Sequence, residues 1–429
     1  MLVLHISDIH FREPDCLVPA MDPDRAYRTL VLRDVRQRVR TLGNVGAILV
    51  GGDVAFKGDP REFETALTWI RELSEACGCP FAKIFVVPGN HDVDRSIIDR
   101  IPSVRNARNA IVNAQAQHRE RELRTQFSDA ETGRSLLQPL GAYNDFAKLF
   151  SCQVYPPDHL YWKQDLPIDG GITLRLHGLT SAILSGNNDT RDGPLYVSPL
   201  QTVLEPADDV ANLVMMHHPP DWLIDQDDVN NAVCIRSVMH FFGHKHSQRI
   251  TQERNYVRYE AGAVNPDRHE PGWCPGYNLI EISVSGAGAG RMLNVHSHLL
   301  QYQSVPIERF VPIRTRDDSE VFIDSFPMPA TDPPLLAEDA PEPAIAVYAA
   351  DVPVDVEAAM GDEDTRNLVS RFWKLTMSQR REIALAMRLI DESELQLPEP
   401  ERYGRALLRA GERGLLNELT REVAARERR

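Results

Sequence analysis

Five short polar motifs occur between residues 8 and 246, and each of them follows an apolar run. In chain order they are Asp8-Ile9-His10, Gly51-Gly52-Asp53, Gly89-Asn90-His91-Asp92, His217-His218-Pro219-Pro220 and Gly243-His244-Lys245-His246. A carboxylate can bridge two cations, while neutral imidazole and amide oxygen complete the coordination shells without excess negative charge. The motifs therefore predict a site for a pair of divalent metal ions.

Eight apolar segments have the length and composition of β-strands. They are residues 2–7, 45–50, 84–87, 172–176, 213–216, 237–242, 257–259 and 277–284. Helical patterns at residues 26–42 and 61–76 lie between the early segments, and this alternation predicts an α/β fold. Because ligands bind beyond the carboxyl ends of the strands in open α/β sheets, we expect the five motifs to meet there.

The order of the motifs resembles that of the calcineurin-like metallophosphoesterases. The shared pattern is D-x-H, G-D, G-N-H-D, H and G-H-x-H, and it spans residues 8 to 246. The resemblance implies a four-layer αββα sandwich, and the apolar segments up to about residue 300 fit that fold. It also implies two divalent metal ions. Nitrogen and oxygen ligands without thiolate favour Mn²⁺, with Fe or Zn²⁺ as alternatives.

The resemblance also implies a role for each motif residue. The implied ligands are Asp8, His10 and His246 for one metal, Asn90, His217 and His244 for the other, and Asp53 as the bridge between them. His91 resembles the histidine that contacts the substrate phosphate, with Asp92 as its orienting partner. His218 and Arg95 are additional candidates for substrate contact.

Such a site predicts hydrolysis by a metal-bridging hydroxide. Two ions about 3.5–4 Å apart lower the pKa of a shared water to near 7, and the resulting hydroxide attacks phosphorus in line. His91 would donate to the phosphoryl oxygens and protonate the leaving alkoxide.

The residues after the second motif bear on the kind of ester. Protein phosphatases of this superfamily continue as G-D-x-x-D-R-G, where the arginine binds a phosphomonoester dianion. This chain reads G-D-V-A-F-K-G from Gly52 to Gly58, so a phosphodiester is the expected substrate. The candidates are a nucleotide, a cyclic nucleotide or an oligonucleotide.

Two branches of the superfamily remain open. The start HISDIHF, the HHPP motif and residues 177–189, HGLTSAILSGNND, resemble the cyclic-nucleotide phosphodiesterase-like branch. The same start and GNHD also resemble DNA-repair exonucleases, so a DNA or RNA nuclease of a bacterial conflict or repair system is the alternative. No basic stripe with interleaved aromatic residues indicates a nucleic-acid groove.

Composition restricts the setting of the protein. The chain has 429 residues and a formal net charge of −15, and it contains no apolar stretch of about 18 residues. No membrane span is therefore predicted. The six cysteines are scattered, which predicts free thiols and a cytoplasmic location.

The chain divides into four predicted parts. Residues 1–316 form the catalytic domain, and residues 95–150 form a helical insertion within it, with nine basic and six acidic residues. This insertion follows His91 and Asp92 directly, so it is either a cap over the site or an addition to the fold. Residues 317–364 contain 14 acidic and no basic residues and predict a proline-rich linker.

Residues 365–429 predict a separate all-α domain. Helical patterns at 368–390 and 402–425 resemble the small death-like effector-associated adaptor domains of bacterial conflict and signalling proteins. The arginines on this domain suit an acidic protein partner. The alternatives are a helical extension that packs on the catalytic domain, or a chain that acts mainly as an adaptor.

Overall fold

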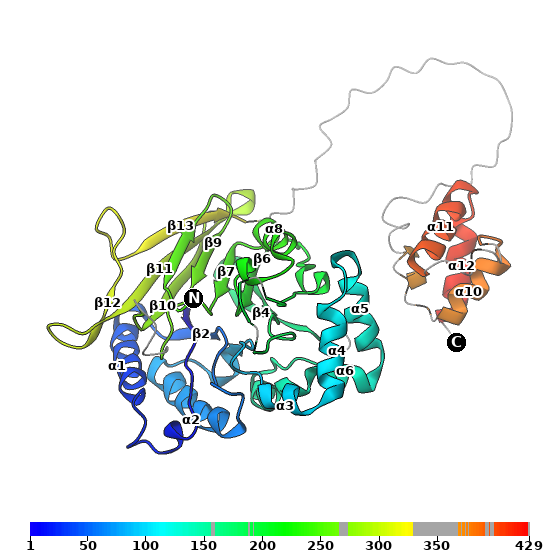
Figure 1. Ribbon diagram of the computed structural model, residues 1–429. Coiled ribbons are helices and arrows are strands. Elements are labelled where there is room, and N and C mark those ends of the chain that lie inside the picture. The colour runs from blue at the N-terminus through cyan, green and yellow to red at the C-terminus, as the bar shows by residue number, and fades with distance from the viewer. Residues whose placement is uncertain are drawn as a thin grey trace, which may run out of the picture. The chain divides into compact units, whose positions relative to one another are not determined.

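The computed structural model contains two compact units, Met1–Glu338 and Asp339–Arg429 (Figure 1). The structure describes residues 1–429 apart from 156–158, 188, 192, 266–272, 329–367, 370, 374, 376, 391–393, 395–398 and 428–429. Within the described residues, none of the helices has the length and apolar character needed to cross a membrane.

Two β-sheets form the first unit. One sheet has seven strands in the order β12-β11-β10-β1-β2-β3, with β13 also paired to β11, and the other has six in the order β4-β5-β6-β7-β9-β8. The first contains β1 (Leu2–Ile6), β2 (Val45–Val50), β3 (Ile84–Val86), β10 (Gly276–Ser285), β11 (Met292–Gln303), β12 (Arg309–Pro312) and β13 (Phe322–Pro327). The second contains β4 (Tyr161–Ile168), β5 (Ile172–Leu179), β6 (Val210–Met216), β7 (Met239–Phe242), β8 (Arg249–Gln252) and β9 (Val257–Glu260).

The strands that carry the motifs are parallel to their neighbours. β1, β2 and β3 run parallel in the first sheet, and β6 and β7 run parallel in the second. They are buried along almost their whole length, because both faces of each sheet are covered. This burial explains why they were readable as continuous apolar runs.

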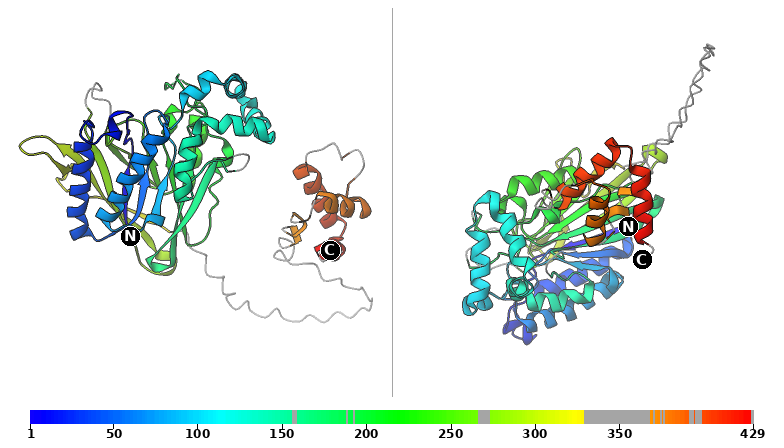
Figure 2. Two further views of the ribbon diagram at one scale, coloured as in Figure 1. Left: turned by 90° about the horizontal axis from the view of Figure 1, so that it is seen from below. Right: turned by 90° about the vertical axis from the view of Figure 1, so that its right-hand side faces the viewer.

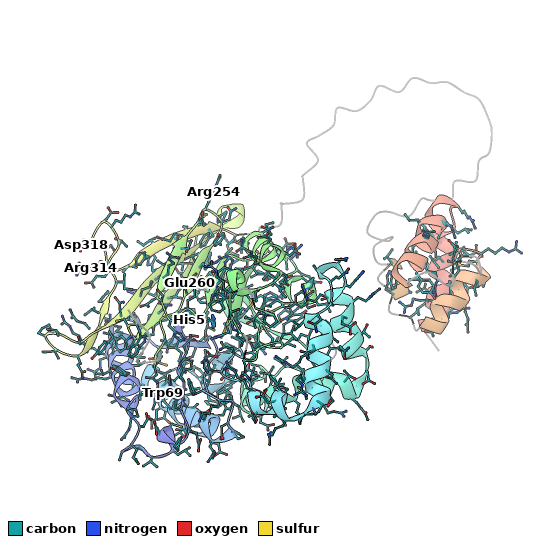
Figure 3. All side chains as sticks on the ribbon, viewed as in Figure 1. His5, Trp69, Arg254, Glu260, Arg314 and Asp318 are labelled. Atoms are coloured by element: carbon teal, nitrogen blue, oxygen red, sulfur yellow. The ribbon has the colours of Figure 1, made fainter. Side chains whose placement is uncertain are left out.

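The two sheets pack through a shared core. The ring of His5 on β1 meets that of Phe241 on β7 at 5.1 Å, and Tyr259 on β9 is hydrogen-bonded to Ser297 on β11 at 2.6 Å. His5 is fully buried inside the first unit (Figure 3). The sheets therefore form one sandwich, and their carboxyl ends share one edge.

Helices flank the sandwich. They include α1 (Arg25–Leu42), α2 (Pro60–Cys77) and α8 (Gln226–Arg236). α2 begins at Pro60, because Asp59 and Glu62 form a capping box there and proline is tolerated in the first turn of a helix. Two sheets flanked by helices confirm the predicted metallophosphoesterase sandwich.

The insertion is helical, as predicted. It comprises α3 (Arg95–Arg100), α4 (Pro102–Val112), α5 (Ala116–Ser128), α6 (Ala130–Leu137) and α7 (Gly141–Ala147). Figures 1 and 2 show α4, α5 and α6 grouped on the side of the first unit opposite α1. α4 ends at Val112, where the backbone N–H of Asn113 donates to the carbonyl oxygen of Asn109, and α5 begins after Gln115, which has a non-helical ψ of 148°.

The first unit extends beyond the boundary predicted at residue 316. Residues assigned to the linker form β13, which pairs with β11 from Phe322 to Pro327. Phe326 and Met328 are buried. The strand was missed because only Phe326 among its six residues is buried and acidic residues surround it. The remainder of the predicted linker, residues 329–364, lies outside the described residues.

The second unit contains three described helices, α10 (Met377–Ala386), α11 (Glu399–Glu412) and α12 (Leu416–Glu427). Its core includes Leu368, Phe372, Ile383, Tyr403 and Leu419. The helix expected at 402–425 is two helices, because Gly414 adopts a left-handed conformation with φ of 67° between α11 and α12.

A chain ending at residue 316 should be less stable than a chain ending at residue 338. The shorter chain lacks β13 and therefore loses the burial of Phe326 and Met328, each worth about 1.5–3 kcal/mol. Urea unfolding of the two chains, followed by circular dichroism, would measure the difference. Equal unfolding midpoints would show that β13 contributes nothing to the sandwich.

Candidate metal centre

The five motifs meet at the carboxyl ends of five strands. Those after β1, β2 and β3 approach from the first sheet, and those after β6 and β7 approach from the second. Their side chains form overlapping clusters in which the potential metal-binding atoms lie within 4.8 Å of one another. The edge where the two sheets meet therefore collects carboxylates, imidazoles and an amide from segments far apart in the chain.

One cluster contains Asp8, His10 and His246. His246 Nε2 lies 3.1 Å from Asp8 Oδ1. His10 Nδ1 lies 2.9 Å from the carbonyl oxygen of Asn265, which can only accept, so Nδ1 carries the hydrogen. The other ring nitrogen, Nε2, therefore presents its lone pair to the centre of the site.

Asp53 lies between this cluster and the next. Its Oδ2 is 3.3 Å from His10 Nε2 and 3.2 Å from His217 Nε2. Its Oδ1 accepts a hydrogen bond from the backbone N–H of His91 at 2.8 Å. One carboxylate oxygen thus faces both clusters, which is the position required of a bridging ligand.

The next cluster contains His217, Asn90 and His244. Asn90 Oδ1 lies 3.2 Å from His217 Nε2 and 3.1 Å from His244 Nδ1. His217 Nδ1–H donates to the carbonyl oxygen of Gly51 at 2.8 Å, which leaves the lone pair of Nε2 facing the site. The amide and both imidazoles therefore converge on one point.

These contacts test whether the residues fit metal ions. In the neutral tautomers, His10 Nε2 and His217 Nε2 are acceptors, yet both face the acceptor Oδ2 of Asp53. Lone pairs that face one another in a buried site repel unless a proton or a cation lies between them. The donor set and its burial fit two divalent cations with nitrogen and oxygen preference.

The ionisation of the metal-free site supports this conclusion. Burial opposes protonation of His217, but the carboxylates of Asp53 and Asp8 raise its pKa to about 9. Burial likewise opposes ionisation of Asp53, yet His217 holds the pKa of that carboxyl well below its usual value. A proton between His217 and Asp53 can therefore take the place of a cation there.

The backbone is strained at the ligands. Asp8, His10, Asp53, His244 and His246 all adopt left-handed conformations, with φ of 56°, 51°, 52°, 68° and 52°. Each such residue costs on the order of 1 kcal/mol or more, and such strain gathers at functional sites. A Cβ on Gly89 would lie 2.1 Å from Asp53 Oδ1, so the glycine is required for the close approach.

His91 lies beside the metal ligands. Its ring stacks on Phe56 with centroids 4.8 Å apart, and its Nδ1–H donates to the carbonyl oxygen of Phe56 at 2.9 Å. Its ring meets that of His10 edge-on at 4.9 Å. Burial is the main reason that the pKa of His91 falls to about 4.

The structure gives Asp92 a different role from the predicted one. Its carboxylate accepts hydrogen bonds from the backbone N–H groups of Ala55, at 2.8 Å, and Gly89, at 2.9 Å. Phe56, rather than Asp92, orients the ring of His91. Asp92 therefore holds the loops of the second and third motifs together. Burial, and then the charge of Asp53, raises the pKa of Asp92 to about 8.

The two candidate substrate contacts are differently placed. Arg95 is the first residue of α3, and its charge acts on both His91 and Asp189. His218 is fully buried, and its ring lies 4.5 Å from that of His244. Arg95 thus lies toward the insertion, and His218 lies within the ligand cluster.

The insertion is attached to a segment beside the site. Arg108 on α4 donates to the carbonyl oxygens of Ile183, at 2.5 Å, and Ser185. Glu120 on α5 accepts from the hydroxyls of Tyr196, at 2.9 Å, and Ser198, at 3.0 Å. Two helices of the insertion therefore hold Ile183, Ser185, Tyr196 and Ser198 through side-chain hydrogen bonds.

Lys245, the free position of the last motif, has carboxylate partners. Its Nζ lies 3.0 Å from Asp221 Oδ1 and 3.0 Å from Glu260 Oε1, and Glu260 is labelled in Figure 3. Trp222 packs edge-on against His244 at 4.0 Å. Sequence reasoning missed Asp221, Trp222, Glu260 and Asn265, because no motif contains them and only the fold brings them to the site.

Three solved structures match the chain at low identity and low TM-score. Vps29 from Chaetomium thermophilum is 11% identical, with a TM-score of 0.31 over 76% of this chain and 99% of that chain. A predicted phosphoesterase from Streptococcus pneumoniae TIGR4 is 12% identical, with a TM-score of 0.28 over 72% and 96% of the two chains. GAP50 from Plasmodium is 10% identical, with a TM-score of 0.33 over 76% and 89%. No curated protein matches the chain.

Two family models match different parts of the sequence. The model of the GTPase-associated adaptor domain matches residues 364–425, which include α10, α11 and most of α12. The model of the calcineurin-like phosphoesterases matches residues 1–248, more than half of the chain, and this range contains all five motifs. The chain therefore belongs to the calcineurin-like phosphoesterase family.

Proposed function

We propose that this protein is a phosphodiester hydrolase that uses two divalent metal ions and acts on a nucleotide, a cyclic nucleotide or an oligonucleotide. The observation that supports it best is the position of Asp53 Oδ2, which faces the Nε2 lone pairs of both His10 and His217. When bound, the metals supply an activated water and positive charge for the phosphoryl oxygens. Mn²⁺ suits the donor set, and Fe or Zn²⁺ are alternatives.

His91 is the residue that moves a proton in this proposal. Because its Nδ1–H is held by Phe56, Nε2 is the ring nitrogen left for the substrate. With a pKa of about 4 in the free site, His91 is neutral near pH 7, so it can donate from Nε2 to the leaving oxygen only when the negative charge of the bound ester raises that pKa. The stacking on Phe56 restricts the ring to one orientation, which favours a transfer at a fixed position.

The second motif supports a diester substrate. Phe56 and Lys57 stand where protein phosphatases have their aspartate and arginine. The ring of Phe56 is stacked on His91, and Lys57 Nζ contacts the carbonyl oxygen of Glu13 at 3.4 Å on the surface. Neither side chain is therefore placed to bind a phosphomonoester dianion as the arginine of the protein phosphatases does.

We expect a higher kcat/KM for bis-p-nitrophenyl phosphate than for p-nitrophenyl phosphate. The diester carries one negative charge, so it needs less positive charge at the site than the monoester dianion. Initial rates of the Mn²⁺-loaded protein on both esters, at matched pH, would measure the ratio. A preference for the monoester would contradict the proposal. Cyclic nucleotides and labelled single- and double-stranded DNA and RNA, tested in parallel, would separate the nuclease alternative.

The second unit is proposed to bind a protein partner. The adaptor-domain match and the separate hydrophobic core support an interaction module. Fewer of its arginines are available to a partner than the sequence implied, because Arg409 pairs with Glu394 at 2.6 Å within the unit. Leu408 on α11 is 69% exposed, so the surface also offers an apolar contact.

The proposed location is the cytoplasm. All six cysteines are unpaired, and four of them, Cys16, Cys77, Cys79 and Cys152, are buried. Free buried thiols suit a reducing compartment.

A further inference from the structure

His218 differs from the neighbouring histidines in what holds its ring. Its Nδ1 lies 2.8 Å from the hydroxyl oxygen of Ser181, and its backbone N–H donates to the same oxygen at 3.2 Å. Both residues are completely buried. His218 Nε2 is a buried nitrogen that has no hydrogen-bond partner among the described residues. The ring is thus fixed at one end, and its other nitrogen needs a partner.

The partner of Nδ1 determines the tautomer. For His10 and His217 that partner is a carbonyl oxygen, which can only accept, so Nδ1 carries the hydrogen. For His218 it is a hydroxyl, which can donate. Among the residues that the structure describes, Nδ1 is the only acceptor that the Ser181 hydroxyl contacts. Ser181 O–H therefore donates to Nδ1, and Nε2 of neutral His218 carries the hydrogen.

An N–H at Nε2 excludes His218 from the ligand set in this tautomer, because a protonated ring nitrogen has no lone pair for a cation. A ring nitrogen of His218 lies within 4.8 Å of ligand atoms of His217 and His244, and the His218 ring lies 4.5 Å from that of His244. A buried N–H without an acceptor is costly, and an oxygen of a bound substrate would supply that acceptor. A phosphoryl oxygen is the substrate atom that we expect at this position.

We propose that His218 donates a hydrogen bond from Nε2 to a non-bridging phosphoryl oxygen of the substrate, and that Ser181 is the positioning residue that fixes its tautomer. This inference rests on the proposed phosphodiesterase function. It assigns to the phosphoryl group a protein donor on the side of the second metal cluster, separate from His91. The helix α4 supports it indirectly, because Arg108 holds Ile183, two residues after Ser181.

The test compares His218→Ala with His218→Gln, whose amide N–H can replace the Nε2–H donor. Elemental analysis should find the wild-type metal content in both variants. Calorimetric titration of the Mn²⁺-loaded proteins with inorganic phosphate should show binding weakened about 10-fold or more in His218→Ala and largely restored in His218→Gln. Turnover of bis-p-nitrophenyl phosphate should fall about 10²-fold in His218→Ala.

Ser181→Ala supplies the second arm. Without the hydroxyl, the ring is free to adopt either tautomer, so phosphate affinity should fall with metal content unchanged. His240→Ala is the matched control, because His240 is a buried histidine outside the five motifs that contacts the carbonyl oxygen of Ser237 at 3.3 Å.

Three results would each overturn the inference. Loss of a metal in His218→Ala would make His218 a ligand. Unchanged phosphate affinity in His218→Ala, or in Ser181→Ala, would show that His218 does not donate to the phosphoryl group in the proposed tautomer. Phosphate binding is measured without turnover. A wild-type protein that binds two metals and phosphate but hydrolyses no diester would therefore contradict the proposed function alone.

Discussion

Asp53→Asn should remove both metal binding and hydrolysis. The substitution takes away the one carboxylate that faces both clusters and leaves Asp8 as the single negative ligand for two dications. Changes to outer-shell partners already weaken metal binding 10- to 100-fold, so loss of the bridging ligand should exceed about 10²-fold. Elemental analysis of protein purified without chelator should find about two ions per chain in the wild type and far fewer in the variant.

Asp165→Asn provides the matched control for this experiment. Asp165 lies on β4 and pairs with Arg175 at 2.8 Å on the surface, far along the chain from any motif. Removal of such an exposed pair changes stability by about 1 kcal/mol or less and should leave metal content unchanged. Full metal content in Asp53→Asn would show that Asp53 does not bridge the ions.

His91→Ala should keep the metals and lower turnover by about 10²–10⁴-fold, the range for loss of a positioned acid or base. The effect should depend on the leaving group, because p-nitrophenolate leaves without a proton and a nucleoside alkoxide does not. We therefore expect a larger loss with a dinucleotide than with bis-p-nitrophenyl phosphate. Steady-state kcat on both substrates measures that difference.

Metal content is the necessary companion measurement, because His91 also lies within a cluster with His10 and Asp53. His296→Ala, an exposed histidine on β11, serves as the control substitution. An equal loss of turnover on both substrates would exclude His91 as the acid. A loss of one metal would reassign it as a ligand.

Much of the fold was readable because its central strands are buried on both faces. Residues 45–50 were predicted as a strand, and β2 spans Val45–Val50. The edge strands β4 and β13 were not readable in this way. β4 contains Pro167 and alternates buried Trp162 and Leu166 with exposed residues, and β13 buries only Phe326 among its six residues. A half-buried polar strand resembles a loop in sequence.

The candidate ligands were predictable for a different reason. A metal site needs particular side chains directly after particular strands, and those constraints are local in sequence. The groups that orient the ligands are not local. Asn265 contacts His10 across 255 positions, and Gly51 contacts His217 across 166. Any residue can supply a carbonyl oxygen, so no residue type marks these partners.

The role of Asp92 shows the same limit. Its position after His91 suggested that it orients the imidazole, yet its carboxylate binds two backbone N–H groups instead. The sequence places the two residues side by side, but the turn directs their side chains to different neighbours. Adjacency in a motif therefore does not establish contact.

The position of β1 also has a consequence for how the protein is made. β1 is synthesised before the other strands of its sheet, but it is a central strand: Leu2 pairs with Val45 on one side and with Glu281 on the other. A nascent chain that has reached residue 260 already contains all seven candidate ligands, yet one edge of β1 still has no partner. Such an edge is open to pairing with other chains. Because Asp8 and His10 follow β1, we expect their final geometry, and metal binding in it, to be complete only after β10 has been synthesised.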